Sequence, residues 1–217
     1  MTEQNTIRVP QQTRSIEKKK RLMDAAMAEF GAKGFHGTNA KGIAKGAGVS
    51  VGTFYAYFTD KKAILFEIIN QHLIEIDQSI FKTLTRKMDE GATGREVIGH
   101  IVKLGHEAHH HSPELLRVML SMQYIDEDFK EYAATEFNGT TTKLSKFLKT
   151  MSDRLRITDM EAAAQVVANA FEETMHSVAT GQPHVEQDRL YNALIDMTSI
   201  YLFKDPDAPL SHPSQDN

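Results

Sequence analysis

The chain has 217 residues, of which 41% are hydrophobic and 25% charged, and these values are ordinary for a soluble globular protein with a sizeable core. It contains no cysteine, which excludes a disulfide framework and thiolate chemistry. No stretch approaches the roughly 20 apolar residues of a membrane span, and the N-terminus lacks an apolar signal segment, so we expect a cytoplasmic protein with no membrane partner.

The net charge of −4 hides an uneven distribution along the chain. Residues 1–62 contain 11 Lys/Arg and 5 Asp/Glu, whereas residues 63–217 contain 14 and 24. A basic N-terminal third on an acidic body indicates a polyanionic partner for the first part. The alternative is a solvated helix face around Lys18–Arg21, and charge alone does not decide between the two.

The first part of the chain is predicted to form three helices after a polar segment. Residues 1–14 are polar and predict a disordered arm. Ser15 can cap a helix with apolar residues three and four apart, and Gly34 offers its C-terminal stop. Thr38 then predicts the start of a helix to about residue 46, and Ser50 the start of another to about residue 58.

Longer helices are predicted in the remainder of the chain. Thr59 can cap one that runs to about residue 87, and others are predicted over 94–111, from Pro113, over 158–180 and over 184–203. The stretch 126–153 is also helical in pattern, with a candidate break at Asn138-Gly139. The proline-containing tail 205–217 predicts disorder. No alternating stretch of strand length is present, so the predicted fold class is all-α.

Residues 40–58 have the pattern of a helix-turn-helix unit. Ala44 supplies the small side chain that lets two helices cross closely, and Gly48 falls in the turn, where a positive φ favours glycine. Ile43 and Phe54 can share one apolar face. The residues left on the outward face are Ser50, Val51, Thr53, Tyr55 and Ala56.

A longer pattern surrounds this unit. Phe30-x3-Gly34-Phe35-x2-Thr38, Ile43-Ala44 and Gly48-Val49-Ser50-x-Gly52-Thr53-Phe54-Tyr55-x-Tyr57-Phe58-x2-Lys61 together resemble the DNA-binding domain of the TetR family of bacterial regulators, over about residues 16–66 without gaps. The resemblance implies a three-helix DNA-binding domain at 15–60 and a helical ligand-sensing and dimerisation domain at 61–204. It also implies a homodimer that reads a palindromic double-stranded DNA operator, and not an enzyme.

The same resemblance implies specific DNA contacts. Thr53 is placed to meet a base edge, and Gly52 allows the recognition helix to approach closely. Val51 and Ala56 stand where relatives often carry lysine and histidine, which predicts sparse, partly apolar base readout through thymine methyls. The residues expected to contact the phosphate backbone are Thr38, Lys41, Ser50, Tyr55, Tyr57 and Lys61.

Flexible and aromatic residues of the acidic body are candidates for an apolar effector site. Ordinary core packing is the alternative for most of them. His100 and Tyr124 are the candidate polar anchors. The apolar candidates are Met88, Leu104, Met119, Met122, Phe137, Phe147, Phe171 and Met175.

The last two helices are predicted to dimerise. Small residues allow close packing there, and apolar residues form stripes at helical spacing. The family resemblance implies a four-helix interface and release of DNA when a small, largely apolar effector binds. No cofactor is predicted. The dimerisation residues are Ala163, Val167, Ala170, Phe171, Leu190, Leu194, Met197 and Tyr201.

His106-Glu107-x-x-His110 matches the H-E-x-x-H pattern of zinc proteases. The Ser-Pro pair at 112–113 ends the helix soon afterwards, and no third ligand follows at a typical spacing, so we predict neither a catalytic residue nor a metal site. Two other interpretations remain: a metal-dependent hydrolase using His106, Glu107 and His110, and a DNA-binding architectural protein without a ligand. Weak metal binding by His106, His109 or His110 also stays open.

Overall fold

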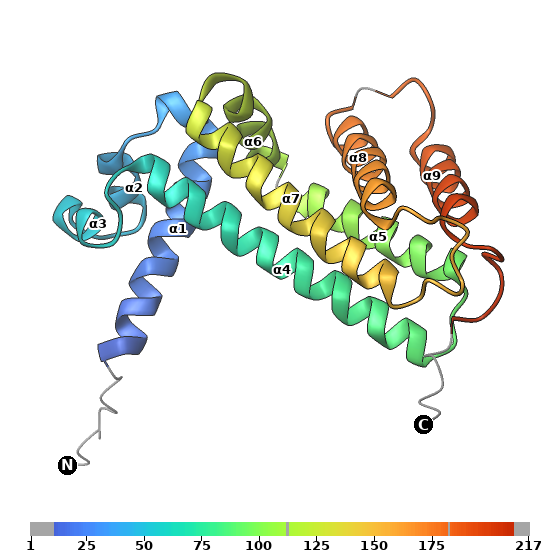
Figure 1. Ribbon diagram of the computed structural model, residues 1–217. Coiled ribbons are helices and arrows are strands. Elements are labelled where there is room, and N and C mark those ends of the chain that lie inside the picture. Colours follow the sequence, from blue (N-terminus) through green and yellow to red (C-terminus); the bar gives the residue numbers. More distant parts are fainter. Residues whose placement is uncertain (1–10, 112, 182, 211–217) are drawn as a thin grey trace, which may run out of the picture. The chain divides into compact units, whose positions relative to one another are not determined.

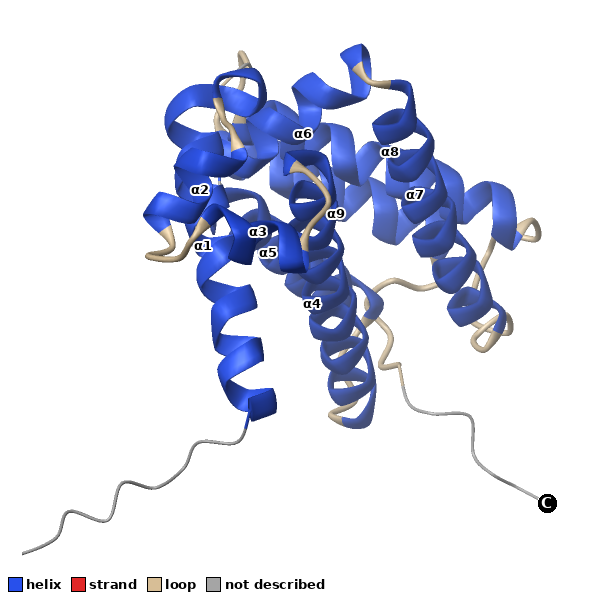
Figure 2. Cartoon of the chain, turned by 90° about the vertical axis from the view of Figure 1, so that its left-hand side faces the viewer, coloured by secondary structure: helices blue, strands red, loops and turns tan. Residues whose placement is uncertain are grey.

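The structure is a computed structural model that describes residues 11–111, 113–181 and 183–210. Over these residues the chain is helical, with short connecting loops and isolated β-bridges in place of sheets (Figure 2). This confirms the all-α prediction. Among the described residues, no helix combines the length and the apolar character that crossing a membrane requires.

The chain divides into two compact units, residues 1–72 and 73–217, which we describe separately. The helix α4 begins in the first unit and continues in the second. The helices of the described residues are α1 (Gln11–Gly37), α2 (Ala40–Gly46), α3 (Val51–Tyr57), α4 (Lys61–Asp89), α5 (Gly94–His111), α6 (Pro113–Ile125), α7 (Glu127–Lys149), α8 (Met160–Ala179) and α9 (Gln187–Leu202) (Figure 1).

The first unit is organised around a small apolar core. Leu22, Phe30, Ile43 and Phe54 come from three different helices, and each is at most 2% exposed. Burial of one such side chain stabilises the fold by about 1.5–3 kcal/mol. Gly34 has a φ of +67° and interrupts the helical backbone of α1, as its position in the sequence predicts.

The predicted N-caps of α2 and α4 are each wrong by one residue. The Asn39 side-chain oxygen, not that of Thr38, accepts the N–H of Gly42 at 2.9 Å and caps α2. Asp60, not Thr59, caps α4, because its Oδ1 accepts the N–H groups of residues 62 and 63 at 2.8 Å. In both places a carboxylate or amide side chain adjacent to the predicted threonine takes the role.

The ordered chain extends beyond the predicted limits at both ends. Helix α1 begins at Gln11, so residues 11–14 of the predicted arm are helical, whereas 1–10 lie outside the described residues. Residues 205–210 are not a disordered tail. Leu210 is 2% exposed, its N–H donates to the Ala92 carbonyl oxygen at 2.8 Å, and the Arg95 side chain binds Asp207. Residues 211–217 lie outside the described part of the chain.

The second unit is a bundle in which α5 packs against α8 and α9, and α7 packs against α8. Helix α7 is continuous, which makes the predicted break at Asn138-Gly139 wrong; a Cβ at Gly139 would meet open space. A close approach occurs between α5 and α8. A Cβ on Gly105 would lie 2.4 Å from Cζ of Phe171, so only glycine fits under this ring.

Candidate nucleic-acid interface and effector cavity

The turn between α2 and α3 has the geometry that the sequence predicts. Gly48 has a φ of +65°, and the N–H of Val49 donates to the Ala44 carbonyl oxygen at 3.0 Å. Ala44 is 1% exposed. A Cβ on Gly46 would lie 3.3 Å from Cβ of Ala25, so α2 can pack this closely on α1 only because both residues are small.

Helix α3 is held from both ends. The Ser50 Oγ accepts the N–H of Thr53 at 3.1 Å and lies 2.9 Å from its hydroxyl, which makes Ser50 the N-cap. Phe54 is fully buried and Phe58 is 6% exposed, so both anchor the helix to the core. This fixes which side of α3 faces outward.

The outward side of α3 carries most of the predicted recognition residues. Val51 is 37% exposed and Tyr55 58%, and Gly52 and Ala56 are exposed as well. A Cβ on Gly52 would meet only the Ser50 Oγ, at 3.8 Å, so packing within the protein does not require glycine there. On α2, Lys41 is exposed.

Besides Ser50, three residues predicted to contact phosphate already form hydrogen bonds with other groups of the protein. Thr38 is 2% exposed and its hydroxyl donates to the Gly34 carbonyl oxygen at 2.8 Å, so it does not present a hydroxyl outward. The Lys61 ammonium donates to the carbonyl oxygens of Phe35 at 2.7 Å and Thr38 at 3.0 Å, and therefore closes the α1–α2 turn. The Tyr57 hydroxyl lies 3.0 Å from the Ser15 Oγ.

Positive charge lies on the surface of the first unit. Within α1, Lys18, Lys20 and Arg21 are exposed, and Lys45 is exposed on α2. Lys19 differs, because its ammonium forms an ion pair with Glu67. Three of the four basic residues 18–21 are thus exposed to solvent.

The second unit contains an apolar cavity of about 140 Å³. Three of the predicted effector residues, Met88, Phe147 and Phe171, line it. Residues of α4 that we did not assign to the site, among them Ile80, line it as well, and Phe81 packs edge-on against Phe147 with ring centroids 6.4 Å apart. The sequence predicted a long helix here, but not that its residues border a cavity.

The other predicted effector residues lie elsewhere, because they are core or surface residues. Met122 is 1% and Met175 0% exposed in the core, whereas Tyr124 is 84% exposed and cannot line a cavity. The Nδ1–H of His100 donates to the Glu96 carbonyl oxygen at 2.7 Å, so its hydrogen bond stays within its own helix. Leu104, Met119 and Phe137 are half-buried and also do not line the cavity.

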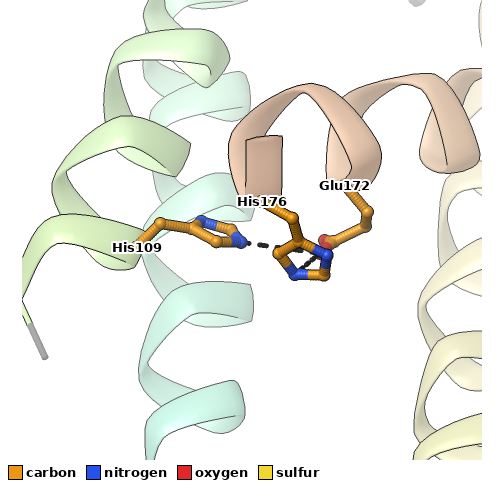
Figure 3. A group of neighbouring side chains, drawn as sticks. All are labelled: His109, Glu172 and His176. Carbon is orange, nitrogen blue, oxygen red and sulfur yellow. Dashed lines mark ion pairs between the residues drawn. The ribbon is translucent and has the colours of Figure 1, made fainter. Parts of the chain in front are cut away.

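Four polar residues border the cavity: Asp77, Thr140, Glu172 and Thr198. Asp77 forms an ion pair with Lys143. The Glu172 carboxylate contacts two histidines, His109 and His176 (Figure 3).

Burial and electrostatic attraction shift the pKa values of His109, Glu172 and His176 in opposite directions. Burial disfavours the imidazolium of His109, but its hydrogen bond and its attraction to Glu172 outweigh burial and raise the pKa of His109. Burial penalises the Glu172 carboxylate, and the contact with His109 nevertheless lowers the pKa of Glu172. For His176 burial dominates and lowers its pKa.

The H-E-x-x-H pattern does not form a site of its own. The Nδ1 of His106 is hydrogen-bonded to the Tyr191 hydroxyl at 2.9 Å, and the Nδ1 of His110 donates to the backbone carbonyl of His106 at 2.9 Å. Over residues 11–111, 113–181 and 183–210, the ligating groups that do converge are those of His109, Glu172 and His176. The two residues from α8 had no local sequence signal.

Some predicted dimerisation residues are inside the protomer. Ala163 is 0% and Leu194 5% exposed, so neither side chain forms an outer face. Val167 and Phe171 are half-buried and line the cavity. Ala170 and Leu190 are half-buried.

An exposed apolar surface nevertheless remains on α8 and α9, which pack side by side (Figure 1). The predicted residues Met197 and Tyr201 are 51% and 39% exposed. Val166 and Ile200, on the same two helices, are 54% and 49% exposed. We call these four residues the α8–α9 face.

Two family models match the chain, one in its N-terminal part and one in its C-terminal part. The family model described as "Bacterial regulatory proteins, tetR family" matches residues 22–68, and the model "Tetracyclin repressor-like, C-terminal domain" matches residues 95–202. The HTH-type transcriptional regulator YdgC of Bacillus subtilis is 31% identical over 118 residues, 54% of this chain and 51% of YdgC. The chain thus spans about half the length of that relative. The repressor KstR of Mycobacterium tuberculosis is 28% identical over 156 residues, 71% of this chain and 68% of KstR.

Solved structures share the fold at low sequence identity. The complex of SmeT with triclosan has a TM-score of 0.72 at 21% identity and covers 92% of this chain and 99% of SmeT. FadR of Bacillus subtilis in complex with stearoyl-CoA has a TM-score of 0.65 at 21% identity, covering 82% of this chain and 96% of FadR. With both family models in their expected order over most of its length, the chain belongs to the TetR family of bacterial transcriptional regulators.

Proposed function

We propose that this regulator is a homodimeric repressor that binds a palindromic operator in the cytoplasm and leaves it when a small apolar effector enters the cavity. The observation that carries the proposal is the outward side of α3, where Val51, Gly52, Tyr55 and Ala56 are exposed on a helix anchored by buried phenylalanines. A helix of this kind fits the major groove. The similarity to KstR, which is named a repressor, supports the sign of regulation.

Readout at the operator follows from the chemistry of this face. Val51 and Ala56 offer methyl groups and no hydrogen-bond donors, so they favour thymine methyls over guanine edges. The Tyr55 hydroxyl and the Lys41 ammonium are suited to phosphate, which positions the helix without reading sequence. The missing side chain of Gly52 leaves room for the DNA backbone, a role that its open surroundings support.

Dimerisation through the α8–α9 face would supply the second recognition helix. A dimer binds half-sites one helical turn apart, about 34–36 Å, so palindromic symmetry of the operator mirrors that of the protein. The exposed side chains of Val166, Met197, Ile200 and Tyr201 supply apolar area that a second copy would bury.

The effector is expected to be small. A cavity of about 140 Å³ is close to the ~150 Å³ of an engineered apolar cavity that binds benzene. Larger molecules would need the walls to move apart. SmeT and FadR, which share the fold, are known in complex with triclosan and stearoyl-CoA, which supports ligand binding as a property of this architecture.

Helix α4 is the proposed link between effector and operator. Its C-terminal half supplies Ile80, Leu84 and Met88 to the cavity wall, and its first residue, Lys61, holds the α1–α2 turn. An effector that displaces this wall would therefore move a helix that also belongs to the DNA-binding unit. Release requires that the effector bind the DNA-free conformation more tightly than the DNA-bound one.

The experiment is selection of genomic fragments by the purified full-length chain at about physiological salt, followed by sequencing. Recovery of a short inverted repeat upstream of a gene supports the proposal, and reporter expression rising on deletion of the regulator identifies repression. Failure to enrich any sequence, both alone and with cell extract added, would contradict it. Uniform, sequence-independent retention would instead identify an architectural DNA-binding protein.

A further inference from the structure

Two histidines and one carboxylate converge from two helices of the second unit. His109 lies on α5, and Glu172 and His176 lie one turn apart on α8 (Figure 3). The Glu172 Oε2 is 3.6 Å from Nε2 of His109 and 3.4 Å from Nε2 of His176, and all three ligating atoms lie within 4.8 Å of one another.

Two of these separations are close to those between the ligands of a tetrahedral metal site. Ligands at 2.0–2.2 Å from a tetrahedral Zn²⁺ are about 3.3–3.6 Å apart. The two contacts of Glu172 therefore need to change by only a few tenths of an ångström to become edges of such a tetrahedron. The third edge joins the ligating nitrogens of His109 and His176, which lie within 4.8 Å of each other on rings whose centroids are 5.2 Å apart.

We propose that His109, Glu172 and His176 form a binding site for a divalent transition metal ion of the zinc type, at the wall of the apolar cavity. Two imidazoles and one carboxylate are borderline ligands that suit Zn²⁺, whereas Ca²⁺ and Mg²⁺ require oxygen ligands and Cu⁺ prefers sulfur. Three protein ligands leave a fourth coordination position for water or for a donor atom of another molecule.

One ligand is already oriented for this role. The Nδ1–H of His109 donates to the Gly105 carbonyl oxygen at 2.8 Å, which fixes the ring and leaves Nε2 as the atom that faces Glu172. A hydrogen bond on the second ring nitrogen is typical of metal-binding histidines. The side chains of His109, His176 and Glu172 are 13%, 28% and 43% exposed, so ions can reach the site from solvent.

The position of Glu172 connects the site to the cavity. Glu172 is a lining residue of the cavity, next to Phe171. The bound metal would therefore lie at the cavity wall, where its fourth ligand could come from an apolar molecule with a carboxylate, hydroxyl or similar donor. A simple ion pair of His109 with Glu172 would use only one histidine and would not need His176.

The test is titration of Zn²⁺ into the full-length chain, freed of metal by chelator, against a competing chromophoric chelator. We expect one Zn²⁺ per chain. Loss of a direct ligand in Glu172→Gln, His109→Ala or His176→Ala should weaken binding by about 100-fold or more, since even outer contacts of metal ligands are worth 10–100-fold. Co²⁺ in place of Zn²⁺ should give the strong visible absorption of a tetrahedral site.

The matched controls are His106→Ala and His110→Ala. Both remove a histidine from the same helix, α5, but these residues contact Tyr191 and the helix backbone instead of the cluster. Both control variants should keep the wild-type affinity for Zn²⁺. Glu172→Gln keeps the shape and volume of the side chain, so its circular dichroism spectrum should match that of the wild type.

Absence of stoichiometric Zn²⁺ binding by the wild type would overturn the proposal. So would equal losses in the controls and the cluster variants, or a loss confined to the controls. Zinc binding is measured on the free protein, so its failure leaves the proposed DNA-binding function untouched, and failure of the operator experiment leaves this site untouched.

Discussion

The ammonium nitrogen of Lys61 lies 2.7 Å from the carbonyl oxygen of Phe35 and 4.5 Å from the centre of the Phe35 ring. The first residue of α4 thus binds the last turn of α1, where carbonyl groups lack helical partners. A lysine that the sequence pattern assigns to phosphate binding therefore stabilises the protein itself. The distinction changes what its substitution should do.

Lys61→Ala should lower the free energy of unfolding by about 1.5–3 kcal/mol, the range for hydrogen bonds to charged groups. Its operator affinity should fall without a change in the salt dependence, because no phosphate contact is lost. Lys41→Ala is the control: stability should stay within about 0.5 kcal/mol, and the slope of log K against log salt should decrease by about 1. Urea unfolding and binding titrations at several salt concentrations measure both. A reduced salt slope for Lys61→Ala would contradict this expectation and show that Lys61 contacts a phosphate of the operator.

Tyr55→Phe should weaken operator binding by about three- to tenfold, the equivalent of one modest hydrogen bond, at unchanged thermal stability. Tyr55 is 58% exposed, so its hydroxyl can reach DNA. Tyr57→Phe removes a hydroxyl that already lies 3.0 Å from Ser15, and should change affinity less. Fluorescence anisotropy with an operator fragment decides the order, and a larger effect at Tyr57 would contradict the orientation of α3.

Gly48→Ala should destabilise the protein by about 1–2 kcal/mol, because a side chain at a φ of +65° is strained although no atom lies within 4 Å of its Cβ. Gly139→Ala should have the opposite sign. Gly139 is in the middle of α7 with open space around it, and alanine there should stabilise by about 0.5–1 kcal/mol. Denaturant unfolding of both variants provides the comparison; two shifts of the same sign would show that the turn geometry is not the cause.

Ile200→Glu should raise the dissociation constant of the dimer by about thirtyfold or more, because a symmetric interface would bury the new charge on both protomers. Ile74→Glu is a matched control, since Ile74 is 46% exposed on α4 and lies outside the α8–α9 face. Analytical ultracentrifugation over a concentration series measures the constants. A dimer that survives Ile200→Glu but not Ile74→Glu would place the interface on α4.

Filling the cavity should abolish ligand binding. Benzene at saturation should raise the thermal midpoint of the wild type, as any ligand of the native state does. Ala168→Leu places a larger side chain at the cavity wall and should remove this shift, whereas Ala162→Leu, at an exposed position of the same helix, should preserve it. Differential scanning fluorimetry records the midpoints; an equal shift in all three proteins would mean that benzene binds elsewhere.

Local patterns predicted the DNA-binding unit well. Gly34 and Gly48 have the positive φ values that their positions suggest, and Phe54 is buried at the helical spacing expected of it. These features depend on interactions within a few residues, or on one apolar face, and both are visible in the sequence. The caps at Asn39 and Asp60 were each displaced by one residue, because neighbouring polar side chains compete for the same backbone N–H groups.

The second unit was less predictable. A methionine or an aromatic residue has the same local pattern in a solid core, at a cavity wall or on the surface, as Met175, Phe147 and Tyr124 illustrate. Which of these applies depends on how the helices pack. The positive charge of Lys61 likewise does not reveal from the sequence whether its ammonium group binds DNA phosphate or backbone carbonyl oxygens of the protein.

The helical fold and the helix-turn-helix unit could be predicted from the sequence, because hydrophobic periodicity, glycine positions and capping residues are local properties. The family followed from the resemblance of the motifs between Phe30 and Lys61 to those of TetR regulators. Tertiary structure alone decided which residues line the cavity, which of the apolar stripes on α8 and α9 stay exposed, and which histidine of 106–110 faces Glu172 and His176. Those outcomes depend on contacts between different helices, some of them far apart in the chain, such as the contact of His109 on α5 with Glu172 on α8. No local pattern encodes such contacts; the packing of whole helices creates them.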